Sequence, residues 1–183
     1  DQGRARALLA EAGYADGFST TISTTPRYLM GVELAEVMAA QLGEVGIEVD
    51  INVLDWGSMV AFWEGLLPEN NPQEIFIMGA GASTADADWG LRPIFQTHPT
   101  NENNYGYYSN AEFDRVIQEA MRETDPDARQ ELYRRAQEIV YLEDPGAVWL
   151  YDNYFILGAR SGVVDITLSP LGVVTFERAA FRE

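Results

Sequence analysis

The 183-residue chain contains no cysteine, no lysine and a single histidine, His98. The absence of cysteine excludes disulfides, thiolate metal sites and a cysteine nucleophile. The absence of lysine excludes Schiff-base chemistry on lysine and the lysine of a phosphate-binding P-loop. One histidine cannot form a multi-histidine zinc site, and its polar neighbours Thr97 and Pro99 predict a surface residue.

Positive charge is also scarce, with 12 basic against 29 acidic residues and a formal net charge of −17. Such a chain would be repelled by nucleic acid and by anionic membranes, so we expect neither as a partner. No stretch approaches the roughly 18 uninterrupted apolar residues of a membrane-spanning helix. The hydrophobic share of 46% is ordinary for a folded globular protein.

Hydrophobic spacing predicts alternating helices and strands in the first half of the chain. Helical spacing recurs in residues 3–13, 32–45 and 56–67, while residues 20–25, 47–53 and 75–78 have the pattern of strands. This alternation favours an α/β sheet with parallel pairs of strands.

The second half is predicted to begin with a long polar loop at residues 79–108. A capping box of Ser109 and Glu112 then predicts a helix start, and Asp125-Pro126 predicts a second one. Residues 148–157 and 163–168 have the composition of strands. The start at Asp1 shows no apolar signal region, and no strand precedes the first helix, so we expect a piece of a larger protein.

Two features of the polar loop could carry chemistry. Asp86 and Asp88 are too few for a calcium loop of the EF-hand kind, so they are expected to cap a helix or to lie in solvent. The small residues of 79–84 follow an expected buried strand and could let a small molecule approach the backbone. They match neither a dinucleotide-binding fingerprint nor a P-loop. A plain turn from strand to loop remains the alternative.

Four segments, taken in order and spacing, resemble the peptide/nickel class of solute-binding proteins that feed ABC importers. They are Ala5 to Tyr14, Gln41 to Val49, Tyr108 to Asp114 and Ser169 to Gly172. The Asp55-Trp56-Gly57 step and the run from Asp125 to Tyr133, similar to the family's D-P-x-x-R-x-x-L-Y helix, extend the resemblance over all 183 residues.

The resemblance implies an α/β fold of the periplasmic-binding-protein type II kind, with a mixed sheet flanked by helices. Residues 1–183 would form a single C-terminal ligand-binding lobe. A missing N-terminal lobe would close with it on a peptide or other small polar solute, outside the cytoplasm or in the periplasm, and an ABC permease would receive the solute. The resemblance implies no catalytic residue, no cofactor and no metal.

The resemblance also implies which residues contact the solute. Peptide binders of the family carry an aspartate where this chain has Ser83, and dipeptide binders carry an arginine where it has Thr25, with Arg27 two residues on. A peptide, a sugar-containing compound and another polar solute such as an opine all remain open. The expected ligand-binding residues are Arg27, Tyr28, Trp56, Gly81, Ala82, Ser83 and Thr84.

Two rival functions remain open on the residues alone. One is a hydrolytic enzyme of unknown type, against which the absence of a Gly-x-Ser-x-Gly nucleophile elbow counts. The other is a receptor or chaperone-like interaction module built on the same fold, which would bind without transporting.

Overall fold

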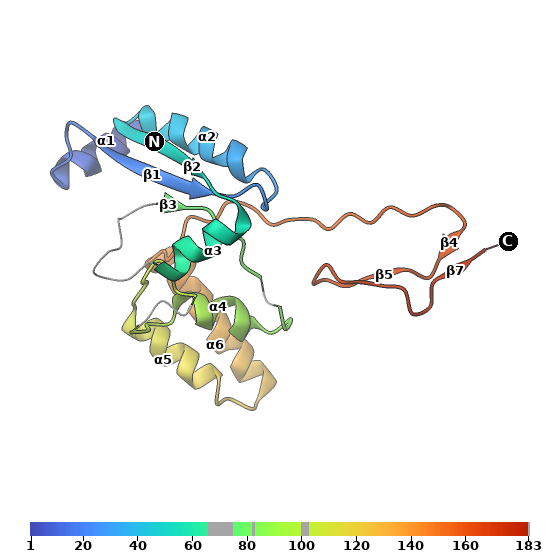
Figure 1. Cartoon of the computed structure of the whole chain (residues 1–183). Helices are drawn as coiled ribbons and strands as arrows, with labels where there is room; N and C mark the ends of the chain where they lie inside the picture. The colour runs from blue at the N-terminus through green and yellow to red at the C-terminus, as the bar shows by residue number, and fades with distance from the viewer. Residues whose placement is uncertain (66–74, 82, 100–102, 183) are drawn as a thin grey trace. The chain divides into compact units, whose positions relative to one another are not determined.

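The computed structural model describes residues 1–65, 75–81, 83–99 and 103–182. The chain falls into two compact units, Asp1–Ala80 and Gly81–Glu183, and each is described by itself. Figure 1 shows the elements of both along the chain. Among the described residues, none of the helices combines the length and apolar character needed to cross a membrane.

The first unit alternates helices and strands, as its hydrophobic spacing predicts. Its elements are α1 (Gln2–Glu11), β1 (Phe18–Thr24), α2 (Gly31–Gly43), β2 (Ile47–Val53), α3 (Trp56–Gly65) and β3 (Ile75–Phe76). The strands form one sheet in the order β2-β1-β3, and both pairings are parallel. The α/β class is thereby confirmed, while the expected end of the third helix at Leu67 lies outside the described residues.

Helix α2 supplies much of the core of this unit, and Figure 1 shows it running alongside β1 and β2. Ile22, Ala35 and Ile77 are buried at the centre. Around them pack partly buried side chains from α2, β2 and β3, namely Leu34, Met38, Leu42, Val49, Ile51 and Ile75. The period-2 alternation of β2 and the helical stripe of α2 therefore face each other, which fixes the register of the sheet.

Two glycines meet where β1 and β2 begin. Gly17 has a φ of +78°, and a Cβ placed there would lie 1.8 Å from the carbonyl oxygen of Gly46. Only a residue without a side chain allows this approach, since the obstacle is backbone and cannot turn away. The contact brings the first residues of the two strands together, where Phe18 pairs with Ile47.

We expect Gly17→Ala to reduce the free energy of unfolding by about 2 kcal/mol or more, because the methyl group adds a backbone clash to a strained φ. The matched control is Gly43→Ala at the end of α2, where a Cβ meets nothing within 4 Å. This control should be neutral or stabilising by up to about 1 kcal/mol. Urea unfolding of both variants measures the difference, and equal effects would contradict the close approach.

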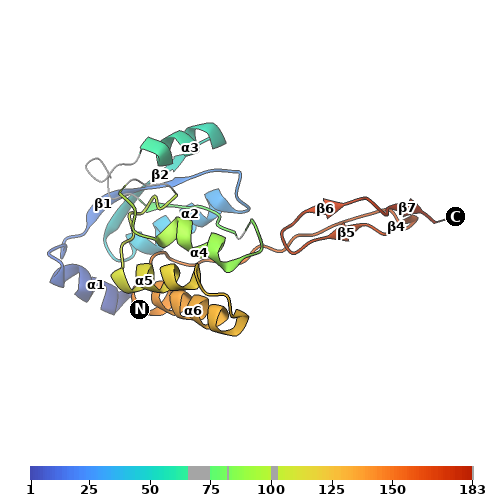
Figure 2. The same cartoon turned by 90° about the horizontal axis from the view of Figure 1, so that it is seen from below.

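The second unit is built on helices that pack around one apolar cluster. They are α4 (Ala87–Phe95), α5 (Ala111–Ala120), α6 (Pro126–Glu138) and a π-helical turn, η1 (Ile139–Glu143). Figure 2 shows α5 and α6 lying side by side. The buried cluster comprises Leu91, Phe95, Phe113, Val116, Ile117, Ala120, Tyr133, Ala136, Ile139 and Val140.

Two expectations for this unit were wrong. Residues 79–108 are not one loop, because Asp86 caps α4 by accepting a hydrogen bond from the Asp88 amide. The cap of α5 is Asn110 instead of Ser109, since the Asn110 side chain accepts from the amides of Glu112 and Phe113, each at 3.0 Å. The predicted start of α6 is confirmed, with Asp125 as the cap and Pro126 in the first turn.

The chain after η1 is extended. Residues 148–157 contain no strand, which corrects the expectation, and the segment 163–168 is divided between β4 (Val163–Val164) and β5 (Thr167–Leu168). Both are short and pair antiparallel, β4 with β7 (Ala180–Phe181) and β5 with β6 (Val174–Thr175). Apolar composition alone predicted strands at 148–157, but a strand also needs a neighbouring strand to satisfy its backbone.

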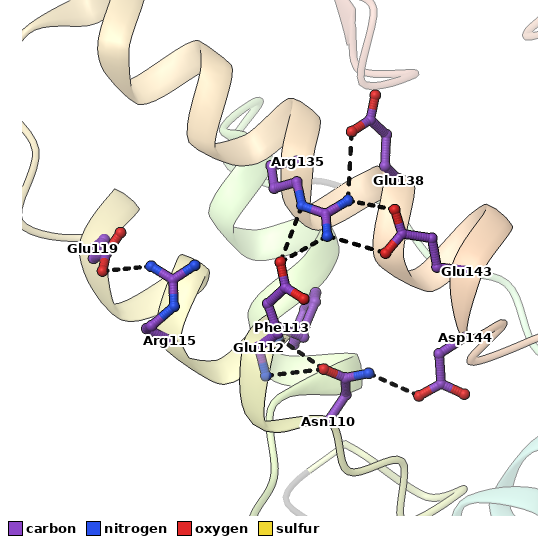
Figure 3. A network of polar contacts seen from close by, with 9 residues as sticks. All are labelled: Asn110, Glu112, Phe113, Arg115, Glu119, Arg135, Glu138, Glu143 and Asp144. Atoms are coloured by element: carbon purple, nitrogen blue, oxygen red, sulfur yellow. Dashed lines mark hydrogen bonds and ion pairs between the residues drawn. The ribbon is translucent and has the colours of Figure 1, made fainter.

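Arg135 of α6 links three elements of the second unit (Figure 3). Its guanidinium donates to Glu112 of α5 at 2.6 Å and to Glu143 of η1 at 3.0 Å, and Glu138 lies 3.7 Å away. Asn110 adds a hydrogen bond to Asp144 at 2.8 Å. Because one arginine serves several carboxylates, fewer side chains lose conformational freedom for each contact than in isolated ion pairs. The shared arginine therefore links the end of η1 to α5.

Tyr108 joins the same region to the apolar cluster. Its ring packs edge-on against Phe95 and Phe113, and its hydroxyl donates to the Asp144 carbonyl at 3.0 Å. Burial, with the nearby Asp144 charge, raises the pKa of Tyr108 to about 12. The folded-state pKa of Tyr108 lies above the ordinary value of 10. The contribution of its hydroxyl to the free energy of unfolding is therefore complete below pH 10 and is lost as the pH rises through about 12.

We expect Tyr108→Phe to be less stable than the wild type by about 1 kcal/mol at pH 8, because it lacks the hydrogen bond to Asp144. Between pH 10 and 12 this gap should shrink, since the unfolded wild type then releases the Tyr108 proton while the folded wild type keeps it. Urea unfolding at several pH values measures the gap. A gap that stays constant up to pH 12 would contradict the assignment.

Candidate functional site

The three parallel strands of the first unit end at one edge of the sheet. The backbone pairing continues beyond the strands themselves, as Leu54 donates to the Thr24 carbonyl at 2.8 Å and Ile77 donates to the Ser23 carbonyl at 3.0 Å. The segments that follow β1, β2 and β3 therefore leave the sheet side by side. The carboxyl edge of a parallel sheet is where α/β proteins bind ligands.

Trp56 is placed at this edge by a cap on α3. The Asp55 carboxylate accepts from the Ser58 amide at 3.1 Å and from the Ser58 hydroxyl at 2.6 Å. These hydrogen bonds hold the pKa of Asp55 below its ordinary value. The Asp55-Trp56-Gly57 step thus begins a helix one residue after β2 has ended its pairing, and it leaves the indole of Trp56 39% exposed.

Three of the expected ligand-binding residues meet here. The Arg27 guanidinium lies 4.3 Å from the centre of the Trp56 ring, in cation–π geometry. The Tyr28 ring meets the Trp56 ring edge-on, with centroids 6.1 Å apart. We call Arg27, Tyr28 and Trp56 the edge cluster. Arg27 and Tyr28 come from the loop after β1, and Trp56 is the first residue of α3, which follows β2.

Further aromatic rings pack against the edge cluster. Trp63, seven residues or about two turns further along α3, is 4% exposed and packs edge-on against Trp56, with ring centroids 5.7 Å apart. It also contacts the partly buried Phe76 of β3, at 6.3 Å between centroids. Trp56 and Trp63 therefore share one face of the helix. One of the two indoles belongs to the core, while the other remains accessible at the surface.

Gly79, the first of the small residues 79–84, also belongs to this site, where a ring of the protein itself approaches its backbone. A Cβ placed there would lie 2.8 Å from a ring carbon of Tyr28, so the glycine allows the ring to lie on the backbone after β3. Burial raises the pKa of the Tyr28 hydroxyl, against the opposing effects of a backbone hydrogen bond from Gly79 and the charge of Arg27. Only the lack of a side chain at Gly79 hinted at this contact.

Thr25 and Arg27, the two positions compared above with the arginine of dipeptide binders, lie in different environments. Thr25 is fully buried, and its hydroxyl accepts from the Arg27 amide at 3.4 Å. Arg27 itself is exposed. Among the residues that the structure describes, no carboxylate pairs with the Arg27 guanidinium. A guanidinium stacked on an indole keeps its N–H edge available, and that edge fits a carboxylate with two hydrogen bonds.

The remaining expected site residues belong to the second unit. Gly81, Ser83 and Thr84 are exposed, and the Ser83 amide donates to the Gly81 carbonyl at 3.0 Å. Ala82 lies outside the described residues. The Thr84 hydroxyl accepts from the Asp86 amide at 3.4 Å, so this segment leads directly into the cap of α4. Whether these residues contact a solute stays a prediction.

Asp86 and Asp88 serve the fold in the way the sequence predicted. Asp86 caps α4, and Asp88 forms an ion pair with Arg92 at 2.8 Å. Within the described ranges, no group of three or more metal-ligating side chains is present.

Comparisons with known proteins agree with this geometry. The family described as "Bacterial extracellular solute-binding proteins, family 5 Middle" matches residues 1–104. The glutathione-binding protein GsiB of Salmonella choleraesuis (strain SC-B67) is 36% identical over 147 residues, which is 79% of this chain and 29% of that protein. The GsiB of Escherichia coli (strain K12) is 35% identical over the same share.

Solved structures show the same fold. The periplasmic binding protein DppA from Helicobacter pylori, in complex with the peptide STSA, aligns with a TM-score of 0.64 and 33% identity over 77% of this chain and 27% of its own. A dipeptide-binding protein from Pseudoalteromonas sp. SM9913, in complex with Met-Leu, aligns over 100% of this chain and 36% of its own, with a TM-score of 0.75 and 24% identity.

The chain spans about 29% of the length of the curated relatives it matches. The family match covers more than half of the chain, including all of the first unit and its edge cluster. The matching family is one of solute-binding proteins, and the relatives named above are binding proteins. The chain therefore belongs to the bacterial extracellular solute-binding proteins of family 5.

Proposed function

We propose that this chain is the C-terminal ligand-binding lobe of an extracytoplasmic solute-binding protein, and that the edge cluster contacts the solute. The observation that carries the proposal is the Arg27 guanidinium stacked 4.3 Å above the exposed Trp56 ring at the carboxyl edge of a parallel sheet. The whole protein captures a peptide or other small polar solute between two lobes and delivers it to an ABC permease.

The chemistry of the edge cluster favours a solute with a carboxylate. Arg27 offers two parallel N–H donors, and the Tyr28 and Trp56 rings offer flat apolar surface beside them. Glutathione, the dipeptide Met-Leu and mannopinic acid, named in the relatives, all carry carboxylates. Ser83 is neutral, which supports a solute that needs no carboxylate partner at that position.

Exposed apolar side chains in the extended C-terminal segment support the missing lobe. Tyr154 is 90% exposed, Ile156 93% and Phe181 86%. Large apolar side chains left this exposed are usually covered by another part of a protein or by a partner. Because the matched residues make up only 29% of the relatives' length, we propose that the rest of the same protein covers this segment.

The proposal is tested by a thermal-shift screen of the full-length protein against peptides such as glutathione and Met-Leu, opines such as mannopinic acid, and sugars, with calorimetry on any compound that binds. A solute at 100 times its dissociation constant adds about 2.7 kcal/mol to the free energy of unfolding, which such a screen detects easily. Binding of at least one carboxylate-bearing compound is expected. Hydrolysis of a bound compound would favour the rival enzyme, and an absence of binding across peptides, opines and sugars would contradict the proposal.

We expect Arg27→Gln in the full-length protein to weaken binding of the compound that the screen identifies by about ten- to hundredfold, because a hydrogen bond to a charged group contributes about 1.5–3 kcal/mol. The matched control is Arg4→Gln, an exposed arginine of α1, which should leave the affinity unchanged. Isothermal calorimetry measures both. Equal affinities for Arg27→Gln and the wild type would show that Arg27 does not contact the solute.

A further inference from the structure

Arg129 connects helix α6 with the segment that leads into α4. Its guanidinium donates to Asp86 at 2.8 Å, across 43 residues of sequence. The Asp86 carboxylate also caps α4 through the Asp88 amide at 2.9 Å. The hydrogen bond from Arg129, together with this amide, holds the pKa of Asp86 below its ordinary value. One carboxylate therefore joins the first turn of α4 to α6.

Tyr133, one turn further along α6, adds a second connection. Its ring is 3% exposed, and its hydroxyl lies 3.4 Å from Asp88. The Arg129 guanidinium lies over this ring at 4.7 Å from its centre and donates to the hydroxyl at 3.2 Å. Arg92 donates to both oxygens of the Asp88 carboxylate. The four side chains Arg129, Tyr133, Asp86 and Asp88 form what we call the α6 clamp.

The clamp lies next to a strained backbone position. Ala85 has a φ of +59°, a left-handed conformation that costs a residue with a side chain about 1–2 kcal/mol. Asp86, a member of the clamp, follows Ala85. Thr84 precedes Ala85, and its hydroxyl accepts a hydrogen bond from the Asp86 amide. Thr84 and Arg129 also line one surface depression together with the exposed Trp89.

An isolated ion pair on the surface contributes little to stability. Arg115 and Glu119 are an example, because they lie four residues apart and their ion pair joins two positions of the same helix, α5. The clamp differs because its partners come from two helices, one of its members is buried, and the backbone that it holds is strained. Arg129 and Tyr133 are also the arginine and the tyrosine of the D-P-x-x-R-x-x-L-Y run from Asp125 to Tyr133.

We propose that Arg129 and Tyr133 are positioning residues that hold Ser83 and Thr84 in a single conformation ready for the solute. This inference rests on the proposed function for its solute and deepens it. The strain at Ala85 favours release of the segment, and the clamp opposes that release. A segment held before binding loses less conformational freedom when the solute arrives, which improves the affinity.

The first test measures the segment itself, by amide hydrogen exchange of the full-length protein without solute. Arg129→Gln should speed exchange at residues 83–88 by about threefold or more, which is the scale of a partly exposed ion pair, and leave α5 unchanged. The control Arg115→Gln should not change exchange at 83–88. Tyr133→Phe keeps the buried ring and should show a smaller effect in the same direction. Unchanged exchange at 83–88 in Arg129→Gln would overturn the proposal.

A rescue variant separates positioning from general destabilisation. Ala85→Gly removes the left-handed strain, so Arg129→Gln combined with Ala85→Gly should exchange more slowly at 83–88 than Arg129→Gln alone. A double variant that exchanges as fast as Arg129→Gln would mean that the backbone at Ala85 does not favour release of the segment, and would overturn that step.

The second test measures binding of glutathione and Met-Leu by calorimetry. Arg129→Gln should weaken the compound that binds by about threefold or more, while Arg115→Gln should leave its affinity unchanged. If the wild type binds one compound and Arg129→Gln binds it equally well, the positioning role is overturned. If the wild type binds neither these two nor any other compound of the screen, the proposed function fails, while the exchange measurement still decides whether the clamp holds the segment.

Discussion

Parallel pairing of β1 with both of its neighbours is the constraint on which the candidate site depends. It places the ends of β2, β1 and β3 at one edge, so that residues far apart in sequence leave the sheet together. The close approach of Gly17 and Gly46 sets the register at the opposite end. With that register fixed, the loop after β1 delivers Arg27, and the helix after β2 delivers Trp56. A slip of one residue would turn every strand side chain to the other face and separate the two.

The edge cluster combines few polar groups with a large aromatic surface. Its supporting ring Trp63 is buried, and the Asp55 cap and the bare backbone of Gly79 fix the orientation of the accessible rings. Under the proposed function, a solute meets rigid aromatic surface and one guanidinium, with little side-chain freedom left to lose. The second unit follows the same principle, since the α6 clamp holds the backbone before Asp86 in a strained conformation.

Sequence patterns predicted the elements whose signals are local. The alternation in β2, the stripe of α2 and the cap at Asp125 each lie within a few residues, and all are confirmed. The extent of α4 was not predicted, because Gly90 and Pro93 interrupt its pattern although Leu91 and Phe95 are buried; the sequence offered only a possible helix cap at Asp86 or Asp88. At the start of α5, Ser109 and Asn110 are both good capping residues, and only the hydrogen bonds distinguish them. Arg27 and Trp56 were predicted from the resemblance, but their stacking was not, since 29 residues separate them and no local pattern encodes the contact.

The central claim is that a solute binds at the carboxyl edge of the parallel sheet, against Arg27 and Trp56. A crystal structure of the full-length protein with a bound carboxylate-bearing solute tests it most directly. The account predicts a solute carboxylate hydrogen-bonded to the Arg27 guanidinium, with the rest of the solute packed on the Trp56 ring. A solute bound without contact to either residue would contradict it.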